Sequence, residues 1–210
     1  ALIQSVVNDL TALGGNIQNL NSPDRAQQLS LMLGALSSGA YQDAYEELTL
    51  LDNQGREVVR LSRQEIIPVA NLVSRSGLDE FVQPKANHET FYGPIQIDKK
   101  SGQAFFLVAI PLYAPRSVQL SNVLVAKLRF GAVSNLIGRA SLGDNQAIYI
   151  TDANGNVVTH ENRAIKLQDA HVTLPANARF QAGLDGSNVA FAYQKRQLGQ
   201  QTLNVVAEKP

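Results

Sequence analysis

The chain has no cysteine and no tryptophan, and Met32 is its single methionine among 210 residues. Without cysteine it has no disulfide, no thiolate metal ligand, no iron–sulfur cluster and no cysteine nucleophile. Three histidines, His88, His160 and His171, make a histidine-based metal site unfavourable. The sequence therefore predicts neither a metal site nor a cofactor.

The chain also has no excess of charge of either sign, since 18 Lys and Arg balance 18 Asp and Glu. Nucleic-acid binders usually carry a basic excess that neutralises phosphates, so no nucleic acid is expected as a partner. The longest apolar run, residues 104–115, has twelve residues and contains Pro111 and Pro115, whereas a membrane-spanning helix needs about 20 apolar residues. The start at Ala1 rather than Met favours a piece of a larger protein.

What is present is the composition of a globular protein, with 44% hydrophobic and 17% charged residues. The first 40 residues are predicted to be helical, because apolar residues recur at spacings of three and four. These residues are Ile3, Val6, Leu10, Leu13, Ile17 and Leu20. Their seam either packs on the chain's own domain or forms a homodimer contact. A second helix is expected to begin with Ser22 as N-cap and Pro23 in its first turn.

Beyond residue 41 the pattern changes to short strands. Residues 47–51 and 58–62 flank an Asp-x-x-Gly turn that begins at Asp52, and residues 147–151 and 157–160 flank another that begins at Asp152. Both predict β-hairpins, and the recurrence with the same flanking strands indicates a duplicated unit. Further strands are predicted at 92–97, 104–113, 123–130, 189–194 and 202–207, with helices at 69–74 and 133–141.

These elements predict an α+β fold with two tandem modules, each built on a central antiparallel sheet. The expected divisions are an N-terminal helical region at 1–40, a first module with its connecting helix at 41–141, and a second module at 142–210.

Catalytic motifs are absent from the sequence: it has no nucleophile elbow, phosphate loop, His-Glu-x-x-His motif or Rossmann glycine pattern. His160 and Glu161 form a pair that suits a general base, but there is no accompanying nucleophile or second acid. A surface hydrogen-bonding pair is the better interpretation. We therefore expect no enzyme, and a small hydrolase is the least favoured hypothesis.

Aromatic and basic residues of the first module form the candidate ligand-binding site. Side chains alternate along a strand, so Phe105 and Tyr113 share one face. Tyr92, Tyr113, Lys127 and Arg129 have polar tips that suit the lining of a pocket. The alternative is that the aromatic residues belong to the core and the basic residues are solvated. The residues alone leave both alternatives open.

Three segments of the first module, residues 91–95, 105–112 and 123–126, resemble the membrane-distal half of a double Cache domain. This is the PAS-like extracytoplasmic sensor module, also called the PDC fold. Residues 147–160 resemble the tyrosine, aspartate, glycine and histidine hairpin of the family's second half. Residues 203–210 resemble its last strand before a membrane helix.

The resemblance implies the periplasmic or extracellular portion of a bacterial or archaeal receptor in the cytoplasmic membrane. Membrane helices outside this chain would anchor it, a small molecule would bind in the distal module, and the N-terminal helix would supply a homodimer contact. Family outputs include histidine kinases, chemoreceptors and diguanylate or nucleotide cyclases, and a sensor histidine kinase is expected here. The alternative partner is a periplasmic binding protein.

One departure from the family bears on the ligand. Amino-acid-binding members resemble one another in an Arg-x-Trp-Tyr cluster and an Asp on the third distal strand. Here residues 87–91 contain neither Arg nor Trp, and Lys127 aligns with the Asp. Lys127 and Arg129 lie two residues apart on one strand face, so an anionic ligand is expected if they face the pocket.

Overall fold

The computed structural model describes residues 2–19, 24–38, 42–63, 65–98, 101–114, 116–131, 146–160, 165–174 and 180–210. Two compact units are present: Ala1–Gly93 with Phe106–Arg129, and Pro94–Phe105 with Phe130–Pro210. The helix predicted at 133–141 and the module boundary predicted at 141 lie outside the described residues. In the described part of the chain, no helix is long and apolar enough to cross a membrane.

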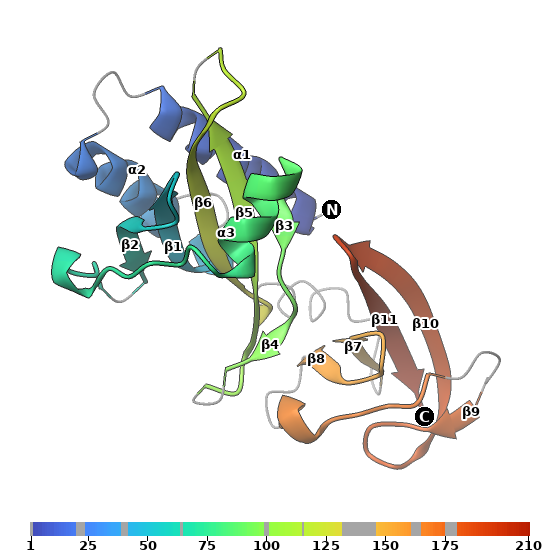
Figure 1. Ribbon diagram of the computed structural model, residues 1–210. Coiled ribbons are helices and arrows are strands. Elements are labelled where there is room, and N and C mark those ends of the chain that lie inside the picture. Colours follow the sequence, from blue (N-terminus) through green and yellow to red (C-terminus); the bar gives the residue numbers. More distant parts are fainter. Residues whose placement is uncertain are drawn as a thin grey trace. The chain divides into compact units, whose positions relative to one another are not determined.

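The first sheet lies between helices on both of its faces (Figure 1). Its strands are β1 (Tyr45–Asp52), β2 (Glu57–Ser62), β3 (Phe91–Tyr92), β4 (Gln96–Ile97), β5 (Ala104–Tyr113) and β6 (Leu120–Arg129). They are ordered β2-β1-β6-β5-β3, and β4 pairs with β5. The helices α1 (Leu2–Gln18) and α2 (Arg25–Ser38) cover one face, and α3 (Asp79–Asn87) covers the other.

The apolar stripe of α1 is buried in its own unit. Leu10 and Ile17 are 0% and 3% exposed. The Tyr45 hydroxyl at the start of β1 donates a hydrogen bond of 2.7 Å to Oδ2 of Asp9 on α1. The seam therefore packs on the chain's own domain, as the first of the two interpretations predicts.

Three helical features differ from the prediction. Ser22 and Pro23 lie outside the described residues, and Asp24 caps α2, because its Oδ1 accepts a hydrogen bond of 2.7 Å from the backbone N–H of Gln27. The helix expected at 69–74 is a single 3-10 turn, η2 (Val69–Asn71). The sequence does not predict α3, because this helix contains Pro84, a residue that normally breaks helices.

The second sheet repeats the layout of the first (Figure 1). Its strands are β7 (Ala147–Thr151), β8 (Val157–His160), β9 (Phe180–Ala182), β10 (Asn188–Leu198) and β11 (Gln201–Lys209). The order β8-β7-β11-β10-β9 corresponds strand by strand to β2-β1-β6-β5-β3. Both sheets also have a register shift at the end of the first strand, between Leu50 and Leu51 and between Ile150 and Thr151. The predicted duplication is therefore confirmed.

The two Asp hairpins share the hydrogen bonds from their backbones to the aspartate. Oδ1 of Asp52 accepts bonds from the backbone N–H groups two and four residues further on, at 2.8 and 2.9 Å. Oδ1 of Asp152 accepts the same two bonds at the same distances. Gly55 and Gly155 complete the turns with φ of 79° and 91°, a left-handed conformation that glycine adopts without strain.

A short segment crosses back over each hairpin tip, and we call residues 73–75 the first strap and residues 170–172 the second strap. Two backbone hydrogen bonds of 2.7 to 3.0 Å tie each strap to its hairpin. The bonded pairs are Glu57 with Val73, Arg75 with Gly55, Val157 with Ala170, and Val172 with Gly155. Glu57 and Arg75 therefore occupy the positions that Val157 and Val172 occupy in the second unit.

Candidate functional site

The first strap brings a guanidinium onto the sheet face that α3 covers. Nε of Arg75 lies 2.7 Å from Oε1 of Glu57. Its Nη2 lies 3.2 Å from Oε1 of Glu47 and 3.4 Å from the Thr49 hydroxyl oxygen. Its Nη1 lies 3.5 Å from Oε1 of Glu80 on α3. One side chain thus links β1, β2 and α3 through three carboxylates.

A second guanidinium lies beside the first. Nη2 of Arg60 on β2 is 2.9 Å from Oε2 of Glu47, and its Nη1 is 3.9 Å from Oε1 of Glu57. The hydrogen bond to Glu47 raises the pKa of Arg60, although burial acts in the opposite direction. We call the following five residues the charged cluster: Glu47, Glu57, Arg60, Arg75 and Glu80.

The charged cluster is largely withdrawn from water. The side chain of Glu57 is 0% exposed, and those of Arg75 and Glu80 are each 11% exposed. Removing charges from water costs several kcal/mol per ion, and pairing repays this cost only when the geometry is good. The burial of these five charged residues is therefore not explained by a gain in stability.

The second unit shows that the fold does not require these charges. Its register places Val157 opposite Thr151 and His160 opposite Tyr149, as Glu57 and Arg60 lie opposite Leu51 and Thr49 in the first unit. Val157 and Val172 belong to an apolar core there, together with Tyr149. The same backbone therefore encloses charge in one copy and hydrocarbon in the other.

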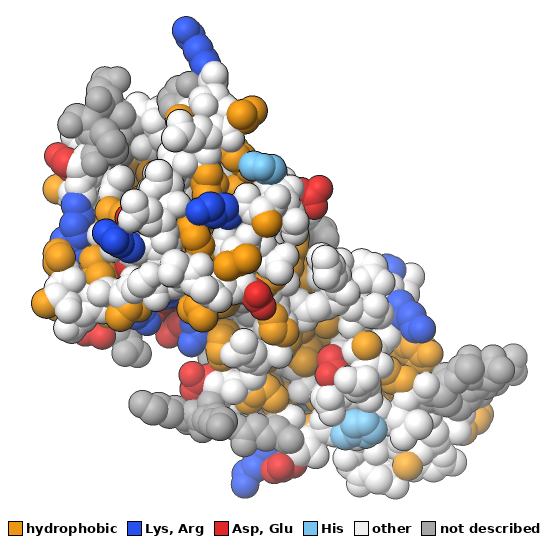
Figure 2. Space-filling model, viewed as in Figure 1, with side chains coloured by type: hydrophobic (Ala, Val, Ile, Leu, Met, Phe, Trp, Pro, Cys, Tyr) orange, Lys and Arg blue, Asp and Glu red, His pale blue; other side chains and the backbone are white. Residues whose placement is uncertain are grey.

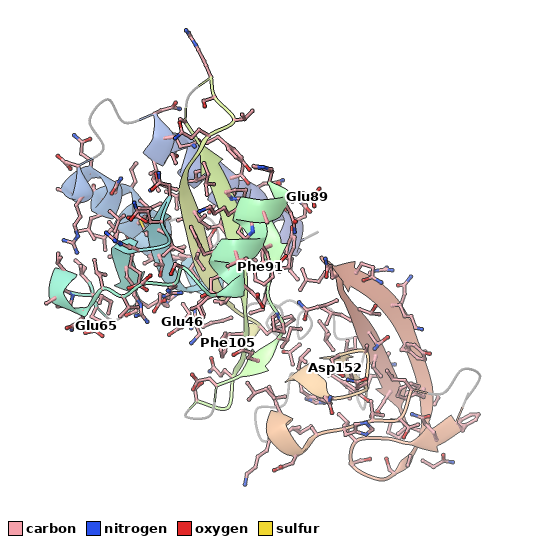
Figure 3. The ribbon with its side chains drawn as sticks, in the orientation of Figure 1. Glu46, Glu65, Glu89, Phe91, Phe105 and Asp152 are labelled. Atoms are coloured by element: carbon pink, nitrogen blue, oxygen red, sulfur yellow. The ribbon has the colours of Figure 1, made fainter. Side chains whose placement is uncertain are left out.

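Lys127 and Arg129 lie on the cluster's side of the sheet. Lys127 is directly opposite Glu47 in the pairing of β6 with β1, so both side chains share a face. Arg129 follows on the same face, but it holds the chain around the start of β1. Its Nη2 donates a hydrogen bond of 2.6 Å to the Asp43 carbonyl, and its Nε lies 3.4 Å from Oε2 of Glu46, which Figure 3 labels.

The three aromatic candidates are not brought together. Tyr92 pairs with Val108 and faces the side of α1, away from Lys127. Tyr113 lies at the β5–β6 hairpin, where its hydroxyl oxygen is 3.2 Å from Nδ1 of His88. Burial raises the pKa values of both tyrosines. Phe105 is assigned to the second unit. Ligand binding by these residues stays a prediction.

The sequence does not predict the charged cluster as a site. Arg75 lies in an irregular segment, and its approach to Glu57 depends on the path of the first strap. One feature of the sequence does point to the cluster: when the two Asp-x-x-Gly turns are aligned, Glu57 occupies the position of Val157. A buried-strand position that is charged in one repeat and apolar in the other is a candidate functional position.

The second unit has a different polar contact. The Tyr149 hydroxyl donates a hydrogen bond to Oε1 of Glu208, and both residues are buried. Burial, followed by the hydrogen bond and charge of Glu208, raises the pKa of Tyr149. His160 stacks on Tyr149 with ring centroids 5.5 Å apart, while Glu161 lies outside the described residues. Across the described ranges, no group of three or more His, Cys, Asp or Glu is placed to hold a metal ion.

No family model and no curated protein matches the chain by sequence, but solved structures do. The ligand-binding domain of the Pseudomonas aeruginosa amino acid chemoreceptor PctC, in complex with GABA, aligns with a TM-score of 0.71 at 12% identity. The alignment covers 99% of this chain and 91% of that one.

Two further structures come from other receptors. The extracellular domain of a protein classed as a histidine kinase, vpHK1S-Z8, gives a TM-score of 0.66 at 15% identity, over 99% of this chain and 87% of that one. The periplasmic sensory domain of the Campylobacter jejuni chemoreceptor Tlp1 gives 0.59 at 13% identity, over 95% and 85%. Together with the repeated sheets, these alignments show that the chain has the fold of these ligand-binding and sensory domains, in agreement with the resemblance of its sequence to double Cache domains.

Proposed function

We propose that this chain is the periplasmic or extracellular ligand-binding domain of a transmembrane signalling receptor, and that a small molecule binds in its first unit. The charged cluster carries this proposal, because it places paired charges where the second copy of the same backbone has an apolar core. Solved domains of the same fold support it, since one is described with GABA and another with L-Arg.

The expected ligand is a small molecule with an anionic group. Arg60 is the more exposed guanidinium of the charged cluster, at 30% of its side chain. Lys127 lies on the same face and adds a second cation near it. A carboxylate or phosphate on the ligand would interact with these cations and with the guanidinium of Arg75, which lies beside that of Arg60. Binding would shift the population of two receptor conformations by its differential affinity for them.

For the whole receptor, we propose a sensor histidine kinase with no catalytic activity in this domain; a chemoreceptor or cyclase is the alternative. Membrane helices outside this chain would anchor the domain. If α1 also forms a homodimer contact, it uses the polar side that carries Gln4 and Asn8, because its apolar stripe faces its own sheet.

A thermal-shift screen of carboxylates, amines and amino acids tests the proposal. A compound at 100 times its dissociation constant stabilises the native state by about 2.7 kcal/mol. We expect Lys127→Met to weaken binding of the active compound at least tenfold. Lys195→Met, which removes an exposed lysine from the second unit, serves as the matched control. If no compound raises the unfolding temperature, the small-molecule proposal is wrong.

A protein partner is the second candidate. Five large hydrophobic side chains between residues 66 and 82 are 40% to 61% exposed: Ile66, Val69, Val73, Leu78 and Val82. Figure 2 shows hydrophobic side chains interspersed with polar ones on the face of the first unit that it presents. Loss of receptor output after Val69→Ser and Val73→Ser, with small-molecule binding unchanged, would favour this candidate.

A further inference from the structure

Arg75 is held firmly at one edge and loosely at the other. Its Nε is 2.7 Å from Glu57 Oε1, within the range of a strong charge-assisted hydrogen bond. Glu57 is itself fixed, because its Oε2 accepts a hydrogen bond of 3.0 Å from the Val73 backbone N–H. The Nη atoms have longer contacts, at 3.2 Å to Glu47 and 3.5 Å to Glu80. The guanidinium is thus oriented before any ligand arrives.

Glu80 connects this edge of Arg75 to α3. It lies in the first turn of α3, next to Phe81, which packs against Leu51, Val123 and Val125 on the sheet. The carboxylate of Glu80 therefore holds the beginning of α3 toward the sheet through Arg75. A contact of 3.5 Å is at the long limit for a hydrogen bond, so it is the weakest of the ion-pair contacts that Arg75 makes.

We propose that Glu80 is a built-in competitor of the ligand's anionic group for Arg75. A ligand carboxylate takes the place of the Glu80 carboxylate at Nη1, while Nη2 keeps its contacts with Glu47 and Thr49, and the Glu80 carboxylate leaves together with the start of α3. One carboxylate replaces another, so the local charge balance is retained. The inference rests on the proposed function and adds to it the residue that is displaced and the helix that moves.

The matched pair Glu80→Gln and Asp79→Asn tests the exchange. Both remove one negative charge from the first turn of α3, but Arg75 contacts only Glu80 of the two. The probes are sodium acetate and sodium succinate, titrated against sodium chloride at equal ionic strength and followed by the unfolding temperature. We expect Glu80→Gln to bind a probe at least fivefold more tightly than the unsubstituted chain, and Asp79→Asn to stay within twofold of it.

Hydrogen exchange distinguishes displacement from a structural role. In the unsubstituted chain the probe should speed exchange of the amides at the start of α3. In Glu80→Gln these amides should exchange faster without the probe, and the probe should add little. Arg75→Lys, which retains the charge but loses the Nη1 donor, should weaken probe binding at least tenfold. If Arg75→Lys does not fold, the Glu80→Gln comparison decides.

The outcomes separate this inference from the proposed function. Equal probe affinity in Glu80→Gln and Asp79→Asn overturns the exchange, and so does a lack of response to either carboxylate. If an amine or neutral compound from the screen still binds, the proposed function stands without the exchange. If no compound binds at all, both are wrong.

Discussion

The two units build nearly the same backbone around different interiors. In the first unit, the strap side chain Arg75 enters a set of three carboxylates, whereas the equivalent Val172 enters an apolar core. The hairpins, the register shifts and the bonds from strap to hairpin are the same in both. The architecture therefore depends on the shared backbone contacts, and the enclosed side chains are free to differ between the two copies.

The largest expected loss of stability comes from replacing a single residue of the first unit with its counterpart from the second unit. Glu57→Val removes the closest partner of Arg75, leaves it only the longer contacts with Glu47 and Glu80, and should cost up to about 3–5 kcal/mol, because a buried ion pair is broken. Adding Arg75→Val reproduces the pair Val157 and Val172 and should restore most of the stability. Urea unfolding measures both variants. If the double variant is no more stable than Glu57→Val, the two interiors are not interchangeable.

A medium effect is expected from the polar contact of the second unit. Tyr149→Phe leaves the buried Glu208 carboxylate without its hydroxyl donor and should cost about 1–3 kcal/mol at neutral pH. Tyr193→Phe, the same chemical change two strands away, is the control. An equal loss in both variants would contradict a specific role for the Tyr149 hydroxyl.

The pH dependence sharpens this prediction. The pKa of Tyr149 is raised above its ordinary value of 10.0, so the native state keeps this proton when the unfolded state releases it. The resulting stability is complete below pH 10 and declines as the pH rises above it, by at most about 1.4 kcal/mol per pH unit. The difference between the unsubstituted chain and Tyr149→Phe should therefore shrink above pH 10, as urea unfolding in alkaline buffers would show.

The smallest effect should be nearly the same in both units, although Oδ2 of Asp152 also accepts a hydrogen bond of 2.7 Å from Nδ2 of Asn156. Asp52→Ala and Asp152→Ala each remove an acceptor of two backbone hydrogen bonds at an exposed turn, where water replaces part of the loss. Each should cost about 1 kcal/mol, and Asn53→Ala in the same turn is the control. Urea unfolding should give values for the two aspartates within about 0.5 kcal/mol of each other. A clearly larger loss at one of them would show that the hairpins are not equivalent.

The sequence predicts the parts of the fold that depend on local chemistry. The two Asp-x-x-Gly turns identify both hairpins, and the resemblance to double Cache domains predicts the fold correctly. The strand expected at 92–97 is two short strands, β3 and β4, because Gly93 and Pro94 separate them. The Glu57–Arg75 contact joins a residue of a strand to a residue of an irregular segment. No local sequence pattern predicts a contact of this kind.

The glycine at each hairpin tip limits how these units can be altered by an engineer. A methyl group added to Gly155 would collide with the Val172 carbonyl, and one added to Gly55 would lie 2.7 Å from the Ser76 Cα. These contacts involve main-chain atoms, so no change of rotamer relieves them. Substitutions meant to change ligand binding should therefore be made at the inward-facing strap and strand positions, and the glycines at the hairpin tips should be kept.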